Sequence, residues 1–343
     1  MKRIRFAVIG AGTWGSTHAR IFAEHPHVEL AAVCDANEGR AKEVAQSARA
    51  QRWCTDFNEI AGDDSIAAVG IATPDFAHVE PALAVLRAGK HLLVEKPLAF
   101  TVADCEEIIA AAKQAKVKLM VDFHNRWSPP FFKAKAAIEA GEIGAPMYMY
   151  YRLSDTIWVP TQMLSWAGKS TVAWFLSSHS VDTMHWLLGE RPHRVYCMRR
   201  ARTLTARGIE TPDFYQTALE FPSGATALME NGWILPETTP NIIDLKFEIV
   251  GDQGALYVDG SHHRMLERYT QNEAAFPDTF IQPTVYGKPL GFAVESIRHF
   301  VDCVVNDGEP LVTGEDGLAA TRVIQAMEQS ADSGEPVDIS WQT

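Results

Sequence analysis

The fold of this chain is decided by Arg3-Ile-Arg-Phe-Ala-Val-Ile-Gly-Ala-Gly-Thr-Trp-Gly15, an apolar run that leads directly into glycines spaced G-x-G-x-x-G. This pattern predicts a buried strand, a tight turn at Gly10 and a following helix. Gly12 would let the backbone approach a pyrophosphate, and Gly15 would let the helix pack closely on the strand. The phosphates would lie on the free N–H groups at the positive end of that helix. The glycine spacing alone also fits a turn in another kind of α/β protein.

A second apolar run, Val28-Glu-Leu-Ala-Ala-Val-Cys-Asp35, strengthens the dinucleotide interpretation. It ends in a carboxylate about twenty residues after the last glycine, where such a site places an acid on the adenosine ribose hydroxyls. Asp35 therefore indicates NAD, because it would repel the ribose phosphate of NADP. Arg40 follows closely and could accommodate that phosphate, so NADP stays possible.

Length and composition predict a two-domain enzyme. The chain has 343 residues, more than one hydrophobic core usually supports, and 47% hydrophobic with 22% charged residues is ordinary globular composition. The net charge of −12 argues against nucleic acid or an anionic membrane as a partner, since both require clustered basic residues. No basic run is longer than Arg199-Arg200.

Targeting and cysteine signals favour the cytoplasm. We find no apolar stretch typical of a signal peptide or a bilayer span. The five cysteines stand singly, without metal-ligand or redox spacing. We therefore expect buried thiols in a reducing compartment, with neither a metal site nor a disulfide framework.

The first third of the chain alternates between predicted strands and helices. After Asp35 we expect a helix over 39–50, a strand over 66–74, a helix over 76–88, a strand over 91–95, a helix over 102–115 and a strand over 118–122. Such alternation specifies a doubly wound parallel sheet, which binds its ligands at the carboxyl ends of the strands.

The pattern changes beyond Pro146 to a run of strands. They are expected over 147–153, 194–200, 214–221, 225–233, 244–250, 255–258 and 264–269, with a last helix over 315–330. We therefore predict an α/β protein with a dinucleotide-binding Rossmann domain over residues 1–122. An α+β domain over residues 123–343 would carry a large, mostly antiparallel open sheet and bind the substrate.

A family resemblance rests on several motifs besides the opening glycines. They are Ala72-Thr-Pro74 with His78, Ala88-Gly-Lys-His-Leu-Leu-Val-Glu-Lys-Pro-Leu98, Asn125-Arg-Trp-Ser-Pro129, His179-Ser-Val-Asp-Thr-Met-His-Trp-Leu-Leu-Gly189 and Gly314-Glu-Asp-Gly317. With these, the chain resembles the Gfo/Idh/MocA oxidoreductases, which are named for glucose–fructose oxidoreductase, inositol dehydrogenase and a rhizopine-catabolism protein. The resemblance implies a lysine beside the nicotinamide, a cis peptide bond before the next proline, and an open sheet in the second domain that joins a homodimer or homotetramer.

The glycine motif and the resemblance together assign a set of positions to the cofactor. They are Gly10, Gly12, Thr13, Trp14, Gly15, Asp35, Arg40, Ala72, Thr73, Pro74, His78, Glu95, Lys96, Pro97 and Asn125.

Lys96 is the first catalytic candidate. A lysine at the carboxyl end of a parallel strand points into the ligand crevice of a doubly wound sheet. Near a cationic nicotinamide and apolar walls its ammonium is disfavoured, which suits it to hold a substrate hydroxyl and share its proton. The residues alone also allow a surface lysine paired with Glu95.

His179 is the second catalytic candidate. Ser177 and Ser178 as N-caps and Gly189 as the stop would place it in the first turn of a short helix, with Asp182 on the same face. A helix N-terminus favours the neutral imidazole, which can take a proton from an alcohol. Taken alone, such a histidine is more often a packed core residue. The resemblance implies that it is the acid/base partner of the lysine.

One position differs from the family pattern. Many members carry an aspartate one helical turn before this histidine, where this chain has Phe175. Either another acid, such as Asp155, supplies that role, or the substrate differs from simple inositols and hexoses. The residues assigned to the substrate are Arg126, Asp155, Trp158 and Asp182.

The sequence therefore predicts an NAD-dependent dehydrogenase that acts on a secondary hydroxyl of a sugar, polyol or sugar acid. Two alternatives stay open. One is a non-catalytic dinucleotide-binding regulator of the same fold, and the other is a lyase or glycosidase that works through a transient keto intermediate on tightly held NAD.

Overall fold

The computed structural model describes residues 3–261 and 266–341. The chain divides into two compact units. The first comprises the chain up to His124 together with Thr284–Thr321, and the second comprises Asn125–Pro283 together with the chain from Arg322 onward. The predicted boundary at 122/123 lies beside the first division, but the return of a later segment to the first unit was not part of that prediction.

A six-stranded parallel sheet forms the centre of the first unit, in the order β3-β2-β1-β4-β5-β6. The strands are β1 (Ile4–Ile9), β2 (Val28–Cys34), β3 (Arg52–Cys54), β4 (Ala68–Ile71), β5 (His91–Val94) and β6 (Leu119–Val121). Their side chains are largely buried on both faces, as expected for a parallel sheet covered by helices. The predicted doubly wound sheet is confirmed.

Helices connect these strands, and local signals mark several of their ends. The helices are α1 (Thr13–Glu24), α2 (Glu38–Ser47), α3 (Asn58–Ala61), α4 (Val79–Arg87), α5 (Val102–Ala115), α8 (Phe292–Asn306) and the first turns of α9 (Gly314–Ser333). The Asn37 and Thr101 side chains cap α2 and α5, accepting hydrogen bonds from Arg40 N and Asp104 N. A short hairpin of β15 (Thr284–Val285) and β16 (Lys288–Pro289) precedes α8.

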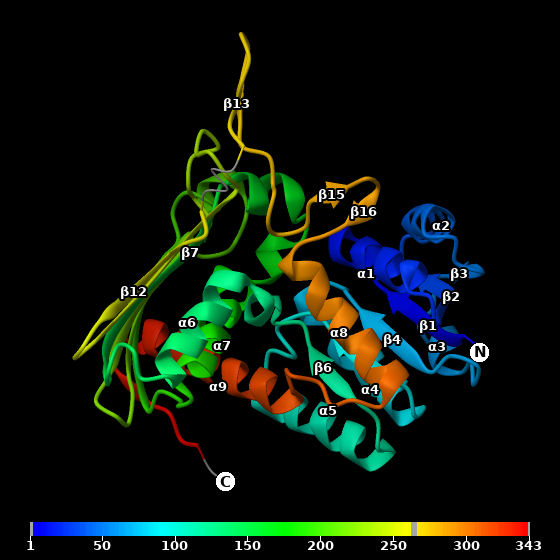
Figure 1. Cartoon of the computed structure of the whole chain (residues 1–343), viewed down its shortest axis with the longest axis horizontal. Coiled ribbons are helices and arrows are strands. Elements are labelled where there is room, and N and C mark those ends of the chain that lie inside the picture. Colours follow the sequence, from blue (N-terminus) through cyan, green and yellow to red (C-terminus); the bar gives the residue numbers. More distant parts are fainter. Residues whose placement is uncertain (1–2, 262–265, 342–343) are drawn as a thin grey trace. The chain divides into compact units, whose positions relative to one another are not determined.

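Helix α8 is the reason why the later segment belongs to the first unit. It lies beside α1 (Figure 1), and the Phe6 ring of β1 contacts both Phe22 of α1 and Phe300 of α8, with ring centroids 5.0 and 6.2 Å apart. The start of α9 also packs closely, because a Cβ at Gly317 would lie 2.8 Å from Leu98 Cβ. The Rossmann core is therefore completed by residues far away in sequence.

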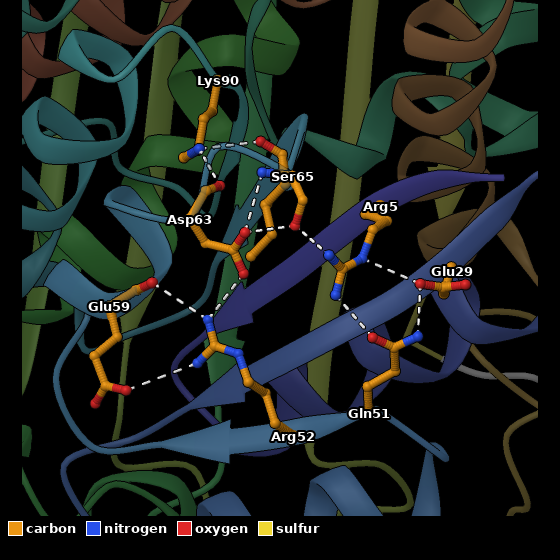
Figure 2. A network of polar contacts seen from close by, with 9 residues as sticks. Arg5, Glu29, Gln51, Arg52, Glu59, Asp63, Ser65 and Lys90 are labelled. Carbon is orange, nitrogen blue, oxygen red and sulfur yellow. Dashed lines mark hydrogen bonds and ion pairs between the residues drawn. The ribbon is translucent and has the colours of Figure 1, made fainter. Parts of the chain in front are cut away.

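A polar network ties together the amino ends of the strands (Figure 2). Arg5 at the start of β1 contacts Glu29 of β2 and Gln51 before β3, at 3.1 and 2.7 Å. The buried Lys90 ammonium donates to the carbonyl oxygens of Asp63 and Ile66, at 2.7 and 3.1 Å. These contacts occupy the edge of the sheet opposite to the carboxyl ends, where a ligand would bind.

The second unit contains a seven-stranded mixed sheet, in the order β12-β11-β7-β10-β9-β8-β17. The strands are β7 (Pro146–Asp155), β8 (Arg194–Arg200), β9 (Phe214–Glu220), β10 (Thr226–Gly232), β11 (Ile243–Gly251), β12 (Ala255–Asp259) and β17 (Val337–Asp338). Neighbours pair antiparallel except β7 and β10, which are parallel. The prediction of a mostly antiparallel open sheet is confirmed.

Helices α6 (Pro129–Glu139) and α7 (Ser178–Leu188) lie along one face of this sheet (Figure 1). Phe131 of α6 packs on Tyr151 of β7 and Phe247 of β11, with centroids 6.0 and 5.7 Å away. Burial alternates along the strands, so one face belongs to the core and the other is exposed.

The predicted strand over 264–269 is only partly testable, because residues 262–265 lie outside the described residues. What is described is a short strand, β13 (Arg268–Tyr269), paired with β14 (Ala274–Ala275). No helix in the described part of the chain is both long and apolar enough to cross a membrane.

Candidate active site

The glycine loop after β1 has the predicted conformation. Gly10 has a φ of +93°, and a Cβ there would lie 2.5 Å from the Ala72 backbone. A Cβ at Gly15 would lie 1.7 Å from Gly10 O, so the start of α1 can approach β1 only without a side chain. Packing within the protein therefore requires both of these glycines.

Gly12 differs, because among the described residues nothing beyond its own chain neighbours lies within 4 Å of a Cβ built on it, and its φ of −78° is open to any residue. Helix α1 begins directly after it, at Thr13, and no side chain caps the helix. An uncapped helix start beside open space is suited to a phosphate group, and a Cβ at Gly12 would project into that space. These residues therefore fit the pyrophosphate of a dinucleotide.

Asp35 lies directly after β2 and reaches back to the glycine loop. Its carboxylate accepts hydrogen bonds from Ala11 N and Asn37 N, both at 2.7 Å. Arg40 Nη2 lies 3.2 Å from Asp35 Oδ1, so the cation predicted as a possible phosphate partner pairs with the acid instead. Asp35 is therefore the acid at the position that binds the adenosine ribose, and an acid there favours NAD over NADP.

The carboxyl ends of β1, β4 and β5 lie side by side, because these strands are neighbours in the sheet. They bring the glycine loop next to Thr73-Pro74 and Glu95-Lys96. His78, at 0% exposure, joins the last two segments: its Nδ1 lies 2.7 Å from Pro97 O and its Nε2 lies 3.1 Å from Thr73 O. The contacts described for His78 are thus with backbone carbonyls, which suits it to hold the segments in place.

Lys96 follows β5 and precedes a cis peptide bond to Pro97, as the resemblance implied. Burial, with a smaller contribution from the positive charge of Lys96, lowers the pKa of both His78 and His124 to about 4. Trp14 stacks on His124, with ring centroids 5.2 Å apart. Lys96 therefore lies near two neutral imidazole rings.

Sequence reasoning did not identify two further residues at this edge, His18 of α1 and Asp122 after β6. Both are completely buried with Glu95, and these three form a group that geometry would allow to hold a metal ion. However, His18 Nε2 lies only 3.1 Å from Glu95 Oε1, a direct hydrogen bond. The only signal in the sequence for this buried group was a histidine, His18, on the face of α1 that was expected to pack on the sheet.

His179 lies in the first turn of α7, as predicted, and Gly189 ends that helix with a φ of +71°. The predicted capping of this helix by Ser177 or Ser178 is wrong. A π-helical turn, Ala173–Ser177, runs directly into α7, and neither serine caps the helix. The Ser177 hydroxyl donates to Asn231 and the Ser178 hydroxyl donates to Trp174 O. The helix dipole therefore gives no support for a neutral His179.

Arg126 and Asp182 form a two-pronged ion pair in the second unit. Arg126 Nε donates to Asp182 Oδ2 at 3.1 Å and Nη2 donates to Oδ1 at 2.5 Å, and both side chains are largely buried. Asn125, assigned above to the cofactor, lies in the same unit, and its amide is 3.4 Å from Tyr151 Oη and 3.5 Å from Thr183 Oγ1. Thr183 in turn donates to His179 O, so these residues brace α7.

Phe175, which stands where many family members carry an aspartate, lies within an aromatic cluster. The Phe175 ring contacts Trp166 and Trp233, with centroids 6.2 and 5.6 Å away. Asp155 ends β7 and is buried, and Trp158 is half-buried at the start of a second π-helical turn, Val159–Met163. π-Helical turns occur often at functional sites.

Comparisons with known proteins agree with this description. Residues 4–123 match the family described as "Oxidoreductase family, NAD-binding Rossmann fold", and residues 135–339 match "Oxidoreductase family, C-terminal alpha/beta domain". The chain is 28% identical to scyllo-inositol 2-dehydrogenase (NAD(+)) of Bacillus subtilis (strain 168), over 98% of this chain and 96% of the relative. It is 24% identical to D-apiose dehydrogenase of Paraburkholderia graminis, over 99% of this chain and 90% of that protein.

Among solved structures, the fold is similar to scyllo-inositol dehydrogenase from Lactobacillus casei with bound NAD(H) and scyllo-inositol. The TM-score is 0.84 at 18% identity, covering 98% of this chain and 99% of that one. The chain therefore belongs to the Gfo/Idh/MocA oxidoreductase family, with an NAD-binding Rossmann domain and a C-terminal α/β domain.

Proposed function

We propose that this protein is a dehydrogenase that oxidises a secondary hydroxyl of a cyclic polyol, a sugar or a sugar acid, with NAD as the acceptor. One observation carries the proposal: the glycine loop follows β1 and Lys96 follows β5, two strands separated only by β4, so both lie at the carboxyl edge where such sheets bind ligands. The inositol and apiose dehydrogenases among the relatives support the substrate class.

The protein holds the cofactor with the loop at Gly10 and Gly12, the start of α1 and the carboxylate of Asp35. NAD, when bound, supplies a nicotinamide that accepts the hydride. Lys96 would hold the reacting hydroxyl and share its proton, and His179 would act as general base for the same hydroxyl. This assignment of roles is a proposal.

The second unit offers a substrate both polar and aromatic partners. Asp155 is the acid that we propose in place of the aspartate missing at Phe175, because it ends a core strand in the unit that carries His179. Arg126, Asp182 and Trp158 stay proposed substrate residues. The aromatic cluster around Phe175 favours a substrate that presents a ring face, which stacks well on aromatic side chains.

Single and double variants of Lys96 and His179 test the catalytic roles. Lys96→Ala and His179→Ala should each reduce turnover by roughly 100-fold or more and leave NAD affinity nearly intact. The double variant should be little worse than the worse single variant, because residues acting as a unit are non-additive. The control is Lys113→Ala, since Lys113 is 71% exposed and pairs with Glu315. A fully active Lys96→Ala enzyme would refute the mechanism.

We also propose that the protein is a homodimer or homotetramer joined through the open face of the second unit's sheet. Leu228 of β10, Tyr196 of β8 and Tyr257 of β12 are exposed and lie in one row across the sheet, linked through Ala218 of β9, Tyr150 of β7 and Glu248 of β11 on the strands between them. Leu228 is paired with Tyr150 of β7 in the sheet register. A contiguous apolar face of this kind is uncommon in monomers. Light scattering should give a multiple of 37.9 kDa, and Leu228→Lys should lower it, whereas a monomer mass for the natural protein would contradict the proposal.

A cytoplasmic location is part of the same proposal. The five cysteines are free and buried, which supports a reducing compartment. Fractionation of the source cells with an antibody against the protein tests this, and recovery outside the cytoplasm would contradict it.

A further inference from the structure

Three ionisable side chains lie buried together behind Lys96. His18 Nε2 is 3.1 Å from Glu95 Oε1 and 3.7 Å from Asp122 Oδ2, and the exposed fraction of the three residues is 5% or less. Glu95 directly precedes Lys96 in the chain. The group therefore stands next to the proposed catalytic amine without being part of the open edge.

The fold makes room for the imidazole at this place. The strand beneath it, β4, has Gly70 there, and a Cβ on that residue would lie 2.7 Å from His18 Nδ1. Phe22, one turn later on α1, packs beside it with ring centroids 5.9 Å apart. A histidine this deeply buried costs stability unless charged partners compensate.

The charges around His18 provide that compensation. Burial alone would lower the pKa of His18, but the nearby carboxylates of Asp122 and Glu95, of which Glu95 is hydrogen-bonded to Nε2, raise it to about 9. Burial and the charge of Asp122 raise the pKa of Glu95. Burial opposes ionisation of Asp122, but nearby His18, together with contributions from His124 and Ser296, lowers its pKa. At neutral pH His18 is therefore an imidazolium between two acids.

Glu95 is fixed on its backbone as well as its side chain. The Glu95 N–H donates a hydrogen bond to Ile71 O of β4. On the other side, Asp122 N after β6 donates to Val94 O, the carbonyl directly before Glu95. With both backbone and carboxylate held, Glu95 leaves the following residue little freedom to rotate. Without His18, the carboxylate could turn toward the Lys96 ammonium, whose charge already acts on it.

We infer that His18 is a positioning residue that holds the Glu95 carboxylate inside the sheet and thereby sets the orientation and charge of Lys96. This inference rests on the proposed function for its catalytic consequence. The effect of His18 on the orientation and charge of the Lys96 amine can be measured without any substrate.

The test compares two substitutions of the same residue in the full-length protein. His18→Leu removes the hydrogen bond to Glu95, and His18→Gln keeps an N–H donor. We expect His18→Leu to lower kcat by roughly 100-fold with the NAD dissociation constant within about threefold, the scale of a small misplacement of a reacting group. His18→Gln should recover most of the lost turnover. Phe22→Leu is the matched control, because it loosens the same helix without touching Glu95.

A second readout does not depend on turnover. The pKa of the Lys96 amine is measured by NMR of protein with 13C-labelled lysine, with the signal assigned from Lys96→Arg. In His18→Leu the released Glu95 carboxylate should pair with Lys96 and raise its pKa by about one unit or more. His18→Gln and Phe22→Leu should leave it unchanged.

An unchanged Lys96 titration in folded His18→Leu overturns the inference, as does an equal loss of kcat in Phe22→Leu. If the natural protein oxidises no polyol or sugar while His18→Leu still shifts the Lys96 titration, the proposed function fails and the inference about His18 stands.

Discussion

The buried imidazole of His18 makes the stability of this protein depend on pH in a window that one substitution should remove. Two carboxylates raise the pKa of His18 from 6.5 to about 9, so the folded state keeps a proton that the unfolded chain has released. This contribution is fully present below pH 6.5 and is lost as the pH rises through about 9. The shift corresponds to about 3 kcal/mol of unfolding free energy, at about 1.4 kcal/mol per pH unit.

The charged groups around His18 agree with that direction. Glu95 and Asp122 face it directly, Lys96 acts on Glu95, and His124 acts on Asp122. The raised pKa of Glu95 also removes stability as the pH rises, because a buried carboxyl is more easily kept neutral than charged. The lowered pKa of Asp122 acts in the opposite direction, but only in the acidic range below its usual value of 3.8. Between about pH 6 and about pH 9 the slope should therefore be negative, with the sign that His18 gives.

Urea unfolding of the natural protein and of His18→Gln, at about pH 6 and about pH 9, measures this slope. The natural protein should lose about 3 kcal/mol more than the variant over this range. The control is His27→Gln, because His27 is an exposed histidine near the end of the same helix. Parallel stability curves for the natural protein and His18→Gln would refute the buried imidazolium.

Three further predictions concern the cofactor loop and the core. Gly12→Ala should weaken NAD binding by about tenfold or more in calorimetric titration without lowering Tm, since in the described part of the chain its Cβ would contact nothing beyond its own neighbours; unchanged affinity would contradict the pyrophosphate assignment. NAD should bind more tightly than NADP in tryptophan-fluorescence titrations, and Asp35→Ser should reduce the ratio of the two dissociation constants. Equal or tighter NADP binding by the natural protein would contradict the role of this acid. Phe300→Ala should lower the unfolding free energy by about 3 kcal/mol, because its ring completes the contact of α8 with Phe6 on β1; a change below about 1 kcal/mol in urea unfolding would contradict that packing.

The sequence predicted those parts of the site that depend on local spacing. The turn at Gly10, the uncapped start of α1 and the place of Lys96 after β5 all follow from residues close together in the chain. Strand positions in the second unit were also predictable, and β8 (Arg194–Arg200) has the expected bounds. Local patterns suffice where a glycine, a cap or an alternation in burial decides the conformation.

Contacts between distant residues could not be predicted in the same way. His18 and Glu95 are 77 positions apart, and no local pattern marks a histidine that pairs across a sheet. The parallel pairing of β7 with β10 could not be predicted either, because the pattern of a strand does not indicate which other strand it pairs with. The π-helical turn before His179 cannot be distinguished from ordinary helix in the sequence. Ser177 does precede α7 as predicted, but neither its side chain nor that of Ser178 caps the helix.

The central claim is that this protein moves a hydride from a polyol or sugar carbon to NAD. The most direct measurement incubates the purified protein with NAD and a panel of cyclic polyols and sugars that carry deuterium on their ring carbons, and analyses the nicotinamide products by mass spectrometry. The account predicts deuterated NADH with at least one member of the panel, and none with the Lys96→Ala variant. NAD binding without deuterated NADH from any member would contradict the account and favour a regulator, whereas substrate conversion without NADH accumulation would favour a lyase or glycosidase with tightly held NAD.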